Sequence, residues 1–551
     1  MVAFTLARDE NRKNAVGHCV KQTGMISFAA RAEICTFPLT EEEGNISRQW
    51  DSNGKKHMNT NRRDFLKGTA WMGAAAVAAG CMSAKQGLGF GAGGSMFGFV
   101  AKPMGKIRVG VAGVGERGKD AVHRISSIPG VEVAALCDVR QCAVDGLQKW
   151  LKDTKRPAAK EFVGKDAYKA MCDWDGVDCI YNTTPWELHV PIALYAMRAG
   201  KHAFVEVPSA FTVDECWELV ETSEKTRMNC MQLENCCYGE AELLALNMCR
   251  LGLLGELVHG EGAYIHDLRA RSYNDLGKDA YAYWNHWRLR WNTVHKGNQY
   301  VTHGLIPLMQ NMGINRGDRF DYLVSLESNQ YNFEAYGKAA YPAGDWHHRC
   351  KVQMGDMNTT LVKTANGRSI MIQHDVSSPR PYSRINRITG TKGSFTGGAF
   401  VYGKDSLQCE WPVRFGWEEK PGAGVHDYFT EERQKELRNE YMHPYWRQAG
   451  EIAKKVGGHG GMDFLMDLRW AYCLQNGIPL DTNVYDLAAS CCIGELSERS
   501  VRNRSNSVDV PDFTKGEWKN QKPFGIETVD LSKIGGLGID QVKKNNAALE
   551  V

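Results

Sequence analysis

The sequence predicts an α/β protein with two domains, a doubly wound parallel sheet followed by an α+β domain. Short apolar strands alternate with amphipathic helices between residues 105 and 236, which is typical of a parallel sheet with crossover helices. A glycine-rich turn directly follows the first strand, and beyond Cys237 the alternation gives way to strands that follow one another. The length of 551 residues also exceeds that of one ordinary domain.

Composition excludes several classes of protein. Hydrophobic residues make up 43% of the chain and charged residues 24%, which suits a folded globular protein. The net charge is +3, from 67 basic and 64 acidic side chains, so no electrostatic feature favours binding to nucleic acid. The 17 cysteines include no C-x-x-C pair and no Cys/His cluster with structural-zinc spacing. They predict buried thiols rather than a disulfide framework, and no metal site is expected.

The N-terminal region resembles a twin-arginine export signal. Arg62 and Arg63 precede the apolar run Gly68–Gly80, which is too short to span a bilayer. Met58 lies just upstream, so residues 1–57 are predicted to be a mis-assigned extension, and residues 58–104 the signal and a glycine-rich linker. The protein is therefore expected to be exported by the twin-arginine machinery, to the periplasm or the cell envelope.

Cys81 follows Ala78-Ala79-Gly80, a sequence similar to a lipid-attachment motif. Two interpretations stay open: Cys81 carries a lipid anchor, or it is a thiol beside an ordinary cleavage site. The many other cysteines are compatible with export of a protein that folds before it leaves the cytoplasm.

The first strand of the parallel sheet leads into a dinucleotide-binding turn. Lys106–Ala112 runs into Gly113-Val114-Gly115-Glu116-Arg117-Gly118, and the second strand, Val131–Cys137, ends in Asp138. Glycines let the backbone approach a pyrophosphate on the N-terminus of the next helix, and the aspartate accepts from the adenosine ribose hydroxyls. Its charge disfavours a 2′-phosphate, which predicts NAD rather than NADP, although Arg140 weakens that preference. The alternative is a purely structural glycine turn.

The remaining strands of this domain are predicted at Cys179–Asn182, Ala203–Val205 and Asn229–Leu233, with helices at Glu187–Arg198 and Asp214–Lys225 between them. Ligands bind at the carboxyl ends of such strands. The predicted cofactor contacts, for each of which a packing role is the alternative, are Gly113, Gly115, Glu116, Arg117, Gly118, Asp138, Asn182, Thr184, Trp186, His189, Glu206 and Asn235.

The second domain is predicted over residues 237–504, and residues 505–551 form a tail without a recognisable motif. Its strands are expected at Glu256–Tyr264, Tyr322–Glu327, Met357–Thr364 and Ser369–Asp375. The last two are joined at Asn366-Gly367, a favourable hairpin turn. A helix at Val484–Asn503 is expected to pack back on the first domain.

Three motifs together resemble the Gfo/Idh/MocA-type oxidoreductases over about residues 105–500: G-x-G-x-x-G, T-T-P-x-x-x-H and G-K-H-x-x-x-E-x-P. The resemblance implies a Rossmann domain, a C-terminal domain with an open mixed β-sheet, and action on sugars or cyclitols. The sequence departs from these dehydrogenases at Val207, where they carry the lysine that exchanges a proton with the reacting hydroxyl. Their D-x-G-x-H signature is also not cleanly present, which disfavours a plain dehydrogenase.

At and around these positions, the sequence resembles glycoside hydrolase family 109. The matching segments are Glu206-Val207-Pro208, Gly262–Asp267, Trp287-Arg288, Gly297–Gly304 and Ile314–Asp318. The resemblance implies an NAD-dependent α-N-acetylgalactosaminidase that acts on terminal α-linked N-acetylgalactosamine of mucin or blood-group glycans. Its reaction would oxidise C3 with NAD, remove the C2 proton, eliminate the aglycone, add water and return the hydride, with net retention. The alternatives are an NAD-dependent sugar oxidoreductase and a non-catalytic exported sugar-binding protein, and a homo-oligomer is expected.

The resemblance also implies roles for individual residues. Tyr264 would take the C2 proton, with a pKa lowered by Arg288, and His303 would take the proton of the C3 hydroxyl. Tyr264 and His303 could exchange these roles. Tyr300, three residues before His303, shares a face with it if the segment is helical. The residues expected to contact the sugar are Arg288, Tyr300, Tyr382, His459 and Asp463, the last two with a structural loop and helix N-terminus as the alternative.

Overall fold

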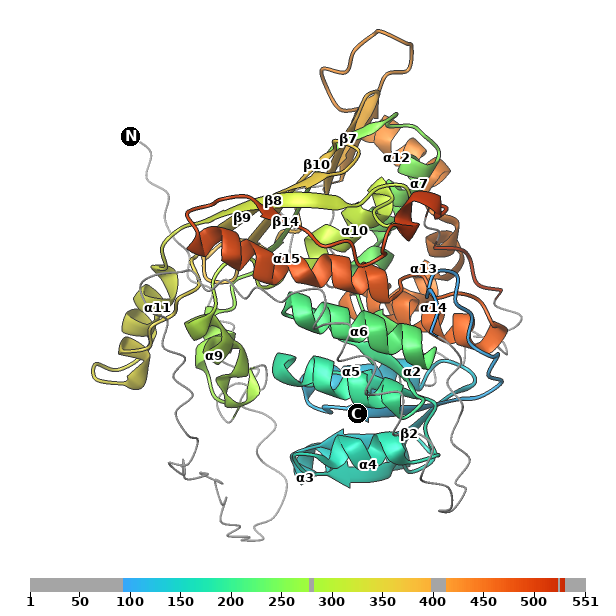
Figure 1. Cartoon of the computed structure of the whole chain (residues 1–551), viewed down its shortest axis with the longest axis vertical. Coiled ribbons are helices and arrows are strands. Elements are labelled where there is room, and N and C mark those ends of the chain that lie inside the picture. Colours follow the sequence, from blue (N-terminus) through green and yellow to red (C-terminus); the bar gives the residue numbers. More distant parts are fainter. Residues whose placement is uncertain (1–92, 277–281, 398–412, 524–525, 531–551) are drawn as a thin grey trace, which may run out of the picture. The chain divides into compact units, whose positions relative to one another are not determined.

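The computed structural model describes residues 93–276, 282–397, 413–523 and 526–530 (Figure 1). Its N-terminal sheet has six strands in the order β3-β2-β1-β4-β5-β6, all parallel. The strands are β1 Ile107–Ala112, β2 Val131–Asp138, β3 Lys160–Val163, β4 Cys179–Asn182, β5 His202–Val205 and β6 Cys230–Gln232. The strand order reverses between β1 and β4, which is where doubly wound sheets bind their ligands. The predicted Rossmann fold is confirmed.

Helices cross between these strands as the sequence pattern predicts. They are α2 Glu116–Ile125, α3 Gln141–Asp153, α4 Ala167–Asp173, α5 His189–Arg198 and α6 Val213–Thr226. The start of α6 is set by a capping box, in which the Thr212 side chain accepts from the Glu215 amide and the Glu215 carboxylate accepts from the Thr212 amide. The sequence pattern does not predict β3 and α4, which add an edge strand and a short crossover helix to the sheet.

The C-terminal sheet has eight strands in the order β13-β12-β11-β7-β10-β9-β8-β14. They are β7 Leu257–Ile265, β8 Phe320–Glu327, β9 Asn358–Thr364, β10 Ser369–Asp375, β11 Arg387–Gly390, β12 Gly393–Thr396, β13 Arg414–Trp417 and β14 Val508–Asp509. Strands β7 and β10 are parallel and the other neighbours antiparallel, so the sheet is mixed, as expected. The β9–β10 hairpin turns at Gly367, whose φ of 87° suits glycine.

Helices of the C-terminal part connect the two sheets. They include α7 Glu240–Arg250, α8 Arg269–Tyr273, α9 Trp287–Val294, α10 Thr302–Met312, α11 Asn332–Ala340, α12 Glu431–Tyr441, α13 Pro444–Val456, α14 Met462–Asn476 and α15 Val484–Arg502. Helix α15 runs beside α6 and also packs on β8, while α14 packs on α2 (Figure 1). The predicted return of the C-terminal helix to the first domain is therefore confirmed.

Close packing at two glycines positions α10 on β7. A Cβ atom on Gly262 would overlap the carbonyl group of Gly304, and one on Gly304 would overlap the backbone of Ala263. The absence of side chains at both positions lets the helix approach the strand backbone directly. Tyr264 on the strand and His303 on the helix are thereby brought together, with ring centroids 5.3 Å apart.

Several predictions concern residues that the structure does not describe. The extension 1–57, the twin-arginine segment with Arg62 and Arg63, Cys81, and the end of the tail from residue 531 all lie outside the described residues. Each cysteine within the described residues is a free thiol, and most of these thiols are buried. Within the same residues, no helix is both long and apolar enough to cross a membrane.

Candidate active site

Two cavities meet at the carboxyl edge of the N-terminal sheet. One, of about 750 Å³, lies over the glycine-rich turn, and the other, of about 570 Å³, lies between that edge and the C-terminal domain. The residues that line both are Glu116, Arg117, Asp120, Thr183, Thr184, Arg271, Tyr283 and Trp287. The shared walls make one continuous site, with a dinucleotide-sized part and a second part beside it.

The larger cavity fits a dinucleotide without a 2′-phosphate. A Cβ atom on Gly113, which has a φ of 81°, would lie 2.7 Å from the Thr184 amide nitrogen, and one on Gly118 would overlap the Gly113 carbonyl oxygen. Asp138 ends β2 at the cavity, where its carboxylate accepts from the Val114 and Arg140 amides at 2.9 Å. A close backbone approach for the pyrophosphate and a carboxylate for the ribose are what NAD requires.

Two of the predicted cofactor contacts have other partners. Asn182 lies outside both cavities, because its side chain donates to the carbonyls of Leu188 and His189 and accepts from Thr184. His189 lines the smaller cavity, but its ring nitrogens lie 2.7 and 2.8 Å from the carbonyl oxygens of Pro208 and Thr184. Both side chains hold the loops that follow the strands, and the cofactor contact predicted for Asn182 is not supported by its position.

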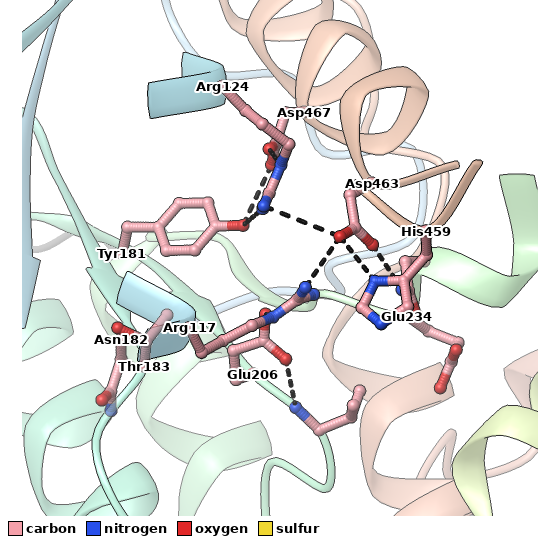
Figure 2. A network of polar contacts seen from close by, with 12 residues as sticks. Arg117, Arg124, Tyr181, Asn182, Thr183, Glu206, Glu234, His459, Asp463 and Asp467 are labelled. Carbon is pink, nitrogen blue, oxygen red and sulfur yellow. Dashed lines mark hydrogen bonds and ion pairs between the residues drawn. The ribbon is translucent and has the colours of Figure 1, made fainter. Parts of the chain in front are cut away.

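Asp463, predicted to contact the sugar, lies at the centre of a buried charge network (Figure 2). Its Oδ2 atom is 2.7 Å from Nη1 of Arg117 and 2.8 Å from Nδ1 of His459, and its Oδ1 accepts from Asn235. Arg117 also pairs with Glu206 at 2.5 Å. Burial opposes ionisation of Asp463, but the charges of Arg117 and His459 hold its pKa well below the ordinary value. This carboxylate therefore joins α14 to the dinucleotide-binding turn.

The network predicts a large loss of stability in Asp463→Ala. The substitution leaves Arg117, and Arg124 at 3.6 Å, without this counter-charge, and breaking a buried ion pair costs about 3–5 kcal/mol. Because the folded pKa is depressed, the stabilisation is present above the pKa of the unfolded state and is lost as pH falls through the folded pKa. Denaturant unfolding at pH 7 and at acidic pH measures both effects.

The matched control is Asp153→Ala, which removes the exposed pair between Lys149 and Asp153 on α3 and should change stability little. Equal losses in the two variants would contradict the assigned role of Asp463.

The second cavity contains a cluster of two tyrosines and a histidine. The rings of Tyr264 and Tyr300 stack with centroids 4.2 Å apart, and the Tyr300 hydroxyl is 3.3 Å from Nε2 of His303. Tyr300 precedes α10 rather than belonging to it, so the helical spacing considered for the Tyr300–His303 pair does not apply. The pair still meets, because the chain turns into the helix at Val301.

Glu234 completes this cluster, although it is not among the site residues predicted from the sequence. Its Oε1 lies 2.7 Å from Nδ1 of His303 and accepts from the Cys236 amide at 3.0 Å. Burial opposes ionisation, but the His303 charge and these hydrogen bonds keep the pKa of Glu234 below its ordinary value. An ionised carboxylate can only accept, so Glu234 accepts from the Nδ1–H group of His303. When His303 is neutral, its Nε2 therefore faces the Tyr300 hydroxyl with a lone pair. The available signal was that Glu234 directly follows a predicted strand.

Arg288 is a buried cation at the wall of the cavity. Its guanidinium carbon lies 4.9 Å from the centroid of the Trp186 ring and 5.0 Å from that of Tyr300. Nη1 donates to the Tyr283 hydroxyl at 3.0 Å, whereas Nη2 has no hydrogen-bond partner among the described residues. Burial opposes the charge, but the surrounding tyrosines raise the pKa of Arg288, so it stays protonated. It can donate to an oxygen atom of a bound molecule.

The environment of Tyr264 differs from the expectation. Burial raises the pKa of its phenol, and the Arg288 charge, 5.5 Å from the ring centroid, only partly offsets that rise. The predicted net lowering is therefore not found, because the desolvation of the phenolate outweighs the attraction of the cation. Tyr382 lies with its ring perpendicular to that of Tyr264, with centroids 6.2 Å apart, and Val207 lines the same cavity.

A doubly wound sheet whose dinucleotide cavity opens onto a Glu–His–Tyr cluster defines an NAD-binding enzyme. Residues 107–233 match the oxidoreductase family with an NAD-binding Rossmann fold, and residues 238–520 match the glycosyl hydrolase 109 C-terminal domain. The chain belongs to glycosyl hydrolase family 109 and is an NAD-dependent glycosidase, as the resemblance implied.

The chain aligns with curated relatives over nearly their whole length. The chain is 44% identical to an alpha-N-acetylgalactosaminidase of Shewanella oneidensis, over 85% of this chain and 99% of that protein. It is 45% identical to glycosyl hydrolase family 109 protein 2 of Shewanella sp. strain ANA-3, over 84% of this chain and 98% of that protein.

Solved structures with the same fold are more distant in sequence. An oxidoreductase domain protein from Kribbella flavida and a levoglucosan dehydrogenase in complex with NADH and L-sorbose each share 18% identity with the chain, at a TM-score of 0.56. Both likenesses cover 74% of this chain and 100% of the other, and they establish the fold.

Proposed function

We propose that the protein hydrolyses terminal α-linked N-acetylgalactosamine, as on mucin or blood-group glycans, by oxidation, elimination, hydration and reduction with net retention. The substrate class is supported by the name of the Shewanella oneidensis relative. The observation that carries the mechanism is the position of His303, held by Glu234 and facing Tyr300 in a cavity continuous with the dinucleotide site.

The carboxylates of the smaller cavity support a route other than ordinary glycoside hydrolysis. That chemistry needs one carboxyl group as acid and a second as base or nucleophile. Among the described residues that line this cavity, Glu116 pairs with Arg271, and Glu206 and Asp463 pair with Arg117. This leaves Asp120, exposed on α2, as a single carboxyl group where that chemistry needs two. The charges of Arg117 and His459 hold the pKa of Asp463 well below its ordinary value, so Asp463 is a poor proton donor. Burial raises the pKa of Glu116, but its carboxylate is engaged by Arg271.

NAD, when bound in the larger cavity, supplies a reversible hydride transfer at C3 of the sugar. In the proposed sequence, Nε2 of His303 takes the proton of the C3 hydroxyl, and Glu234 stabilises the resulting imidazolium. Tyr264 takes the C2 proton. It does so as the phenolate, so its own phenolic proton must leave first. Burial makes this phenolate scarce but strongly basic, and Arg288 is the cation beside it that stabilises the phenolate and the oxygen anion that develops on the sugar.

Hydrolysis of p-nitrophenyl α-N-acetylgalactosaminide without an added acceptor tests this function. We expect nitrophenol release without net accumulation of NADH. Stoichiometric NADH with an intact glycoside would instead identify a sugar oxidoreductase, and binding without turnover would identify a non-catalytic sugar-binding protein.

Tyr264→Phe should lower kcat for this substrate by about 10²-fold or more, because it removes the proposed general base. Bound NAD, measured by absorbance after denaturation, should be unchanged. Tyr195→Phe is the control, since that hydroxyl lies on α5 and donates to Asp173 outside both cavities. Full activity of Tyr264→Phe would remove Tyr264 from the mechanism.

We also propose that the protein is exported by the twin-arginine route. The support is the Arg62-Arg63 motif with its apolar run, together with free thiols throughout the described residues, which suit folding before export. Replacing both arginines with lysine should retain the activity in the cytoplasmic fraction. Unchanged export would contradict the proposal, and fatty-acid labelling of Cys81→Ala distinguishes a lipid anchor from a cleaved signal.

A homo-oligomer is proposed from the C-terminal sheet. Tyr322 and Leu326 on β8 share a face with Leu361 on β9 and are 41%, 67% and 47% exposed. Sedimentation velocity should show a dimer or larger assembly, and a monomer at micromolar concentration would contradict self-association.

A further inference from the structure

An ion pair joins the C-terminal domain to the dinucleotide-binding turn at a second point. Arg271, on the short helix α8 after β7, pairs through Nη2 with the carboxylate of Glu116. Glu116 is the first residue of α2, and Gly115 is its N-cap. In this fold the N-terminus of that helix binds the pyrophosphate, so the pair lies where the phosphates of NAD are held.

The guanidinium of Arg271 has N–H groups that the ion pair with Glu116 does not use. It stacks on the Tyr283 ring, 4.7 Å from the centroid, and lines both cavities. Its Nε is buried without a hydrogen-bond partner among the described residues. Arginine presents five N–H donors in a planar fork that matches phosphate oxygens. Arg271 can therefore hold Glu116 and a phosphate oxygen at the same time.

A second contact spans the adenosine end of the same cavity. The Arg140 guanidinium lies 5.8 Å from the centroid of the Trp284 ring. Arg140 follows Asp138, the predicted ribose ligand, and Trp284 comes from the segment that carries Arg271. Both residues line the larger cavity, and Trp284 is 40% exposed, so it lies at the opening of that cavity rather than in the core.

We propose that the Arg271–Glu116 ion pair, assisted by the Arg140–Trp284 contact, retains NAD in the protein between turnovers. Departure of the dinucleotide requires these contacts to separate, because both cross the cavity from one domain to the other. Arg271 then acts as a cofactor-retaining residue supplied by the C-terminal domain. The inference concerns the cofactor and holds whichever sugar is cleaved.

The test measures dissociation directly. Holoprotein loaded with NADH is mixed with a large excess of NAD, and the loss of NADH fluorescence gives the dissociation rate. Arg271→Gln and Glu116→Gln should each raise that rate by about tenfold or more, since truncating one partner of a partly buried charge pair acts on dissociation. The double variant should be no faster than the faster single variant, because both substitutions remove the same contact.

Arg269→Gln is the matched control on the same helix. Arg269 pairs with Asp267 and lies outside both cavities. NADH should therefore dissociate from Arg269→Gln at the same rate as from the unmodified protein. Trp284→Ala removes a side chain that is 40% exposed, and it should also accelerate release. An unchanged rate in Arg271→Gln, or faster release in Arg271→Gln with none in Glu116→Gln, would overturn the proposal.

Discussion

His303→Gln is expected to lower kcat on p-nitrophenyl α-N-acetylgalactosaminide by about 10²–10⁴-fold, the usual contribution of a general acid–base residue. The glutamine amide cannot accept and return a proton as Nε2 of His303 does. NAD should stay bound, because His303 lies in the smaller cavity and outside the glycine-rich turn. Steady-state kinetics with a parallel assay of bound nicotinamide measure both quantities.

Glu234→Gln tests how Glu234 acts on His303 while the imidazole that transfers the proton is kept. The substitution keeps the shape of the side chain but removes the negative charge that stabilises a protonated His303. The value of kcat should fall while bound NAD is unchanged, because the imidazolium that forms when Nε2 takes a proton loses its counter-charge. An unchanged kcat, or His303→Gln retaining full activity, would contradict the assigned pair.

Gly118→Ala is expected to yield protein without nicotinamide and without glycosidase activity. The added methyl group would overlap the Gly113 carbonyl and approach Oγ1 of Thr183, so the turn and the helix could not keep their close approach. Absorbance of released nicotinamide and nitrophenol release measure the two losses.

Gly105→Ala is the control for this substitution, because an added Cβ there meets nothing within 4 Å and the residue precedes β1. Thermal unfolding of Gly118→Ala shows whether the loss is local or global. A Gly118→Ala protein that binds NAD normally would contradict the dinucleotide site.

The parts of the fold that the sequence predicted are those with local signals. The strand β1, the glycine turn and Asp138 occur within a short stretch, and apolar strands followed by amphipathic helices identify the rest of the sheet. The edge strand β3 was missed because only Phe162 of its four residues is buried, so it has no apolar run. Edge strands commonly lack the hydrophobic pattern of central ones.

The site was less predictable, because its contacts join distant parts of the chain. Asp463 meets Arg117 across 346 positions, and Glu234 meets His303 across 69, so neither partner was visible from the sequence. Asn182 was predicted as a cofactor contact, but its side chain holds its own loop instead. Polar residues at strand ends are as suited to holding their own loop as to binding a ligand, and only the structure distinguishes the two roles.

Hydrolysis of p-nitrophenyl α-N-acetylgalactosaminide in D₂O tests the central claim most directly, with the released sugar analysed by NMR at C2. The claim is that cleavage passes through removal of the C2 proton next to an oxidised C3. We expect deuterium at C2 of the product, because the proton taken by Tyr264 exchanges with solvent before it is replaced. A product that carries only protium at C2 would contradict the elimination mechanism.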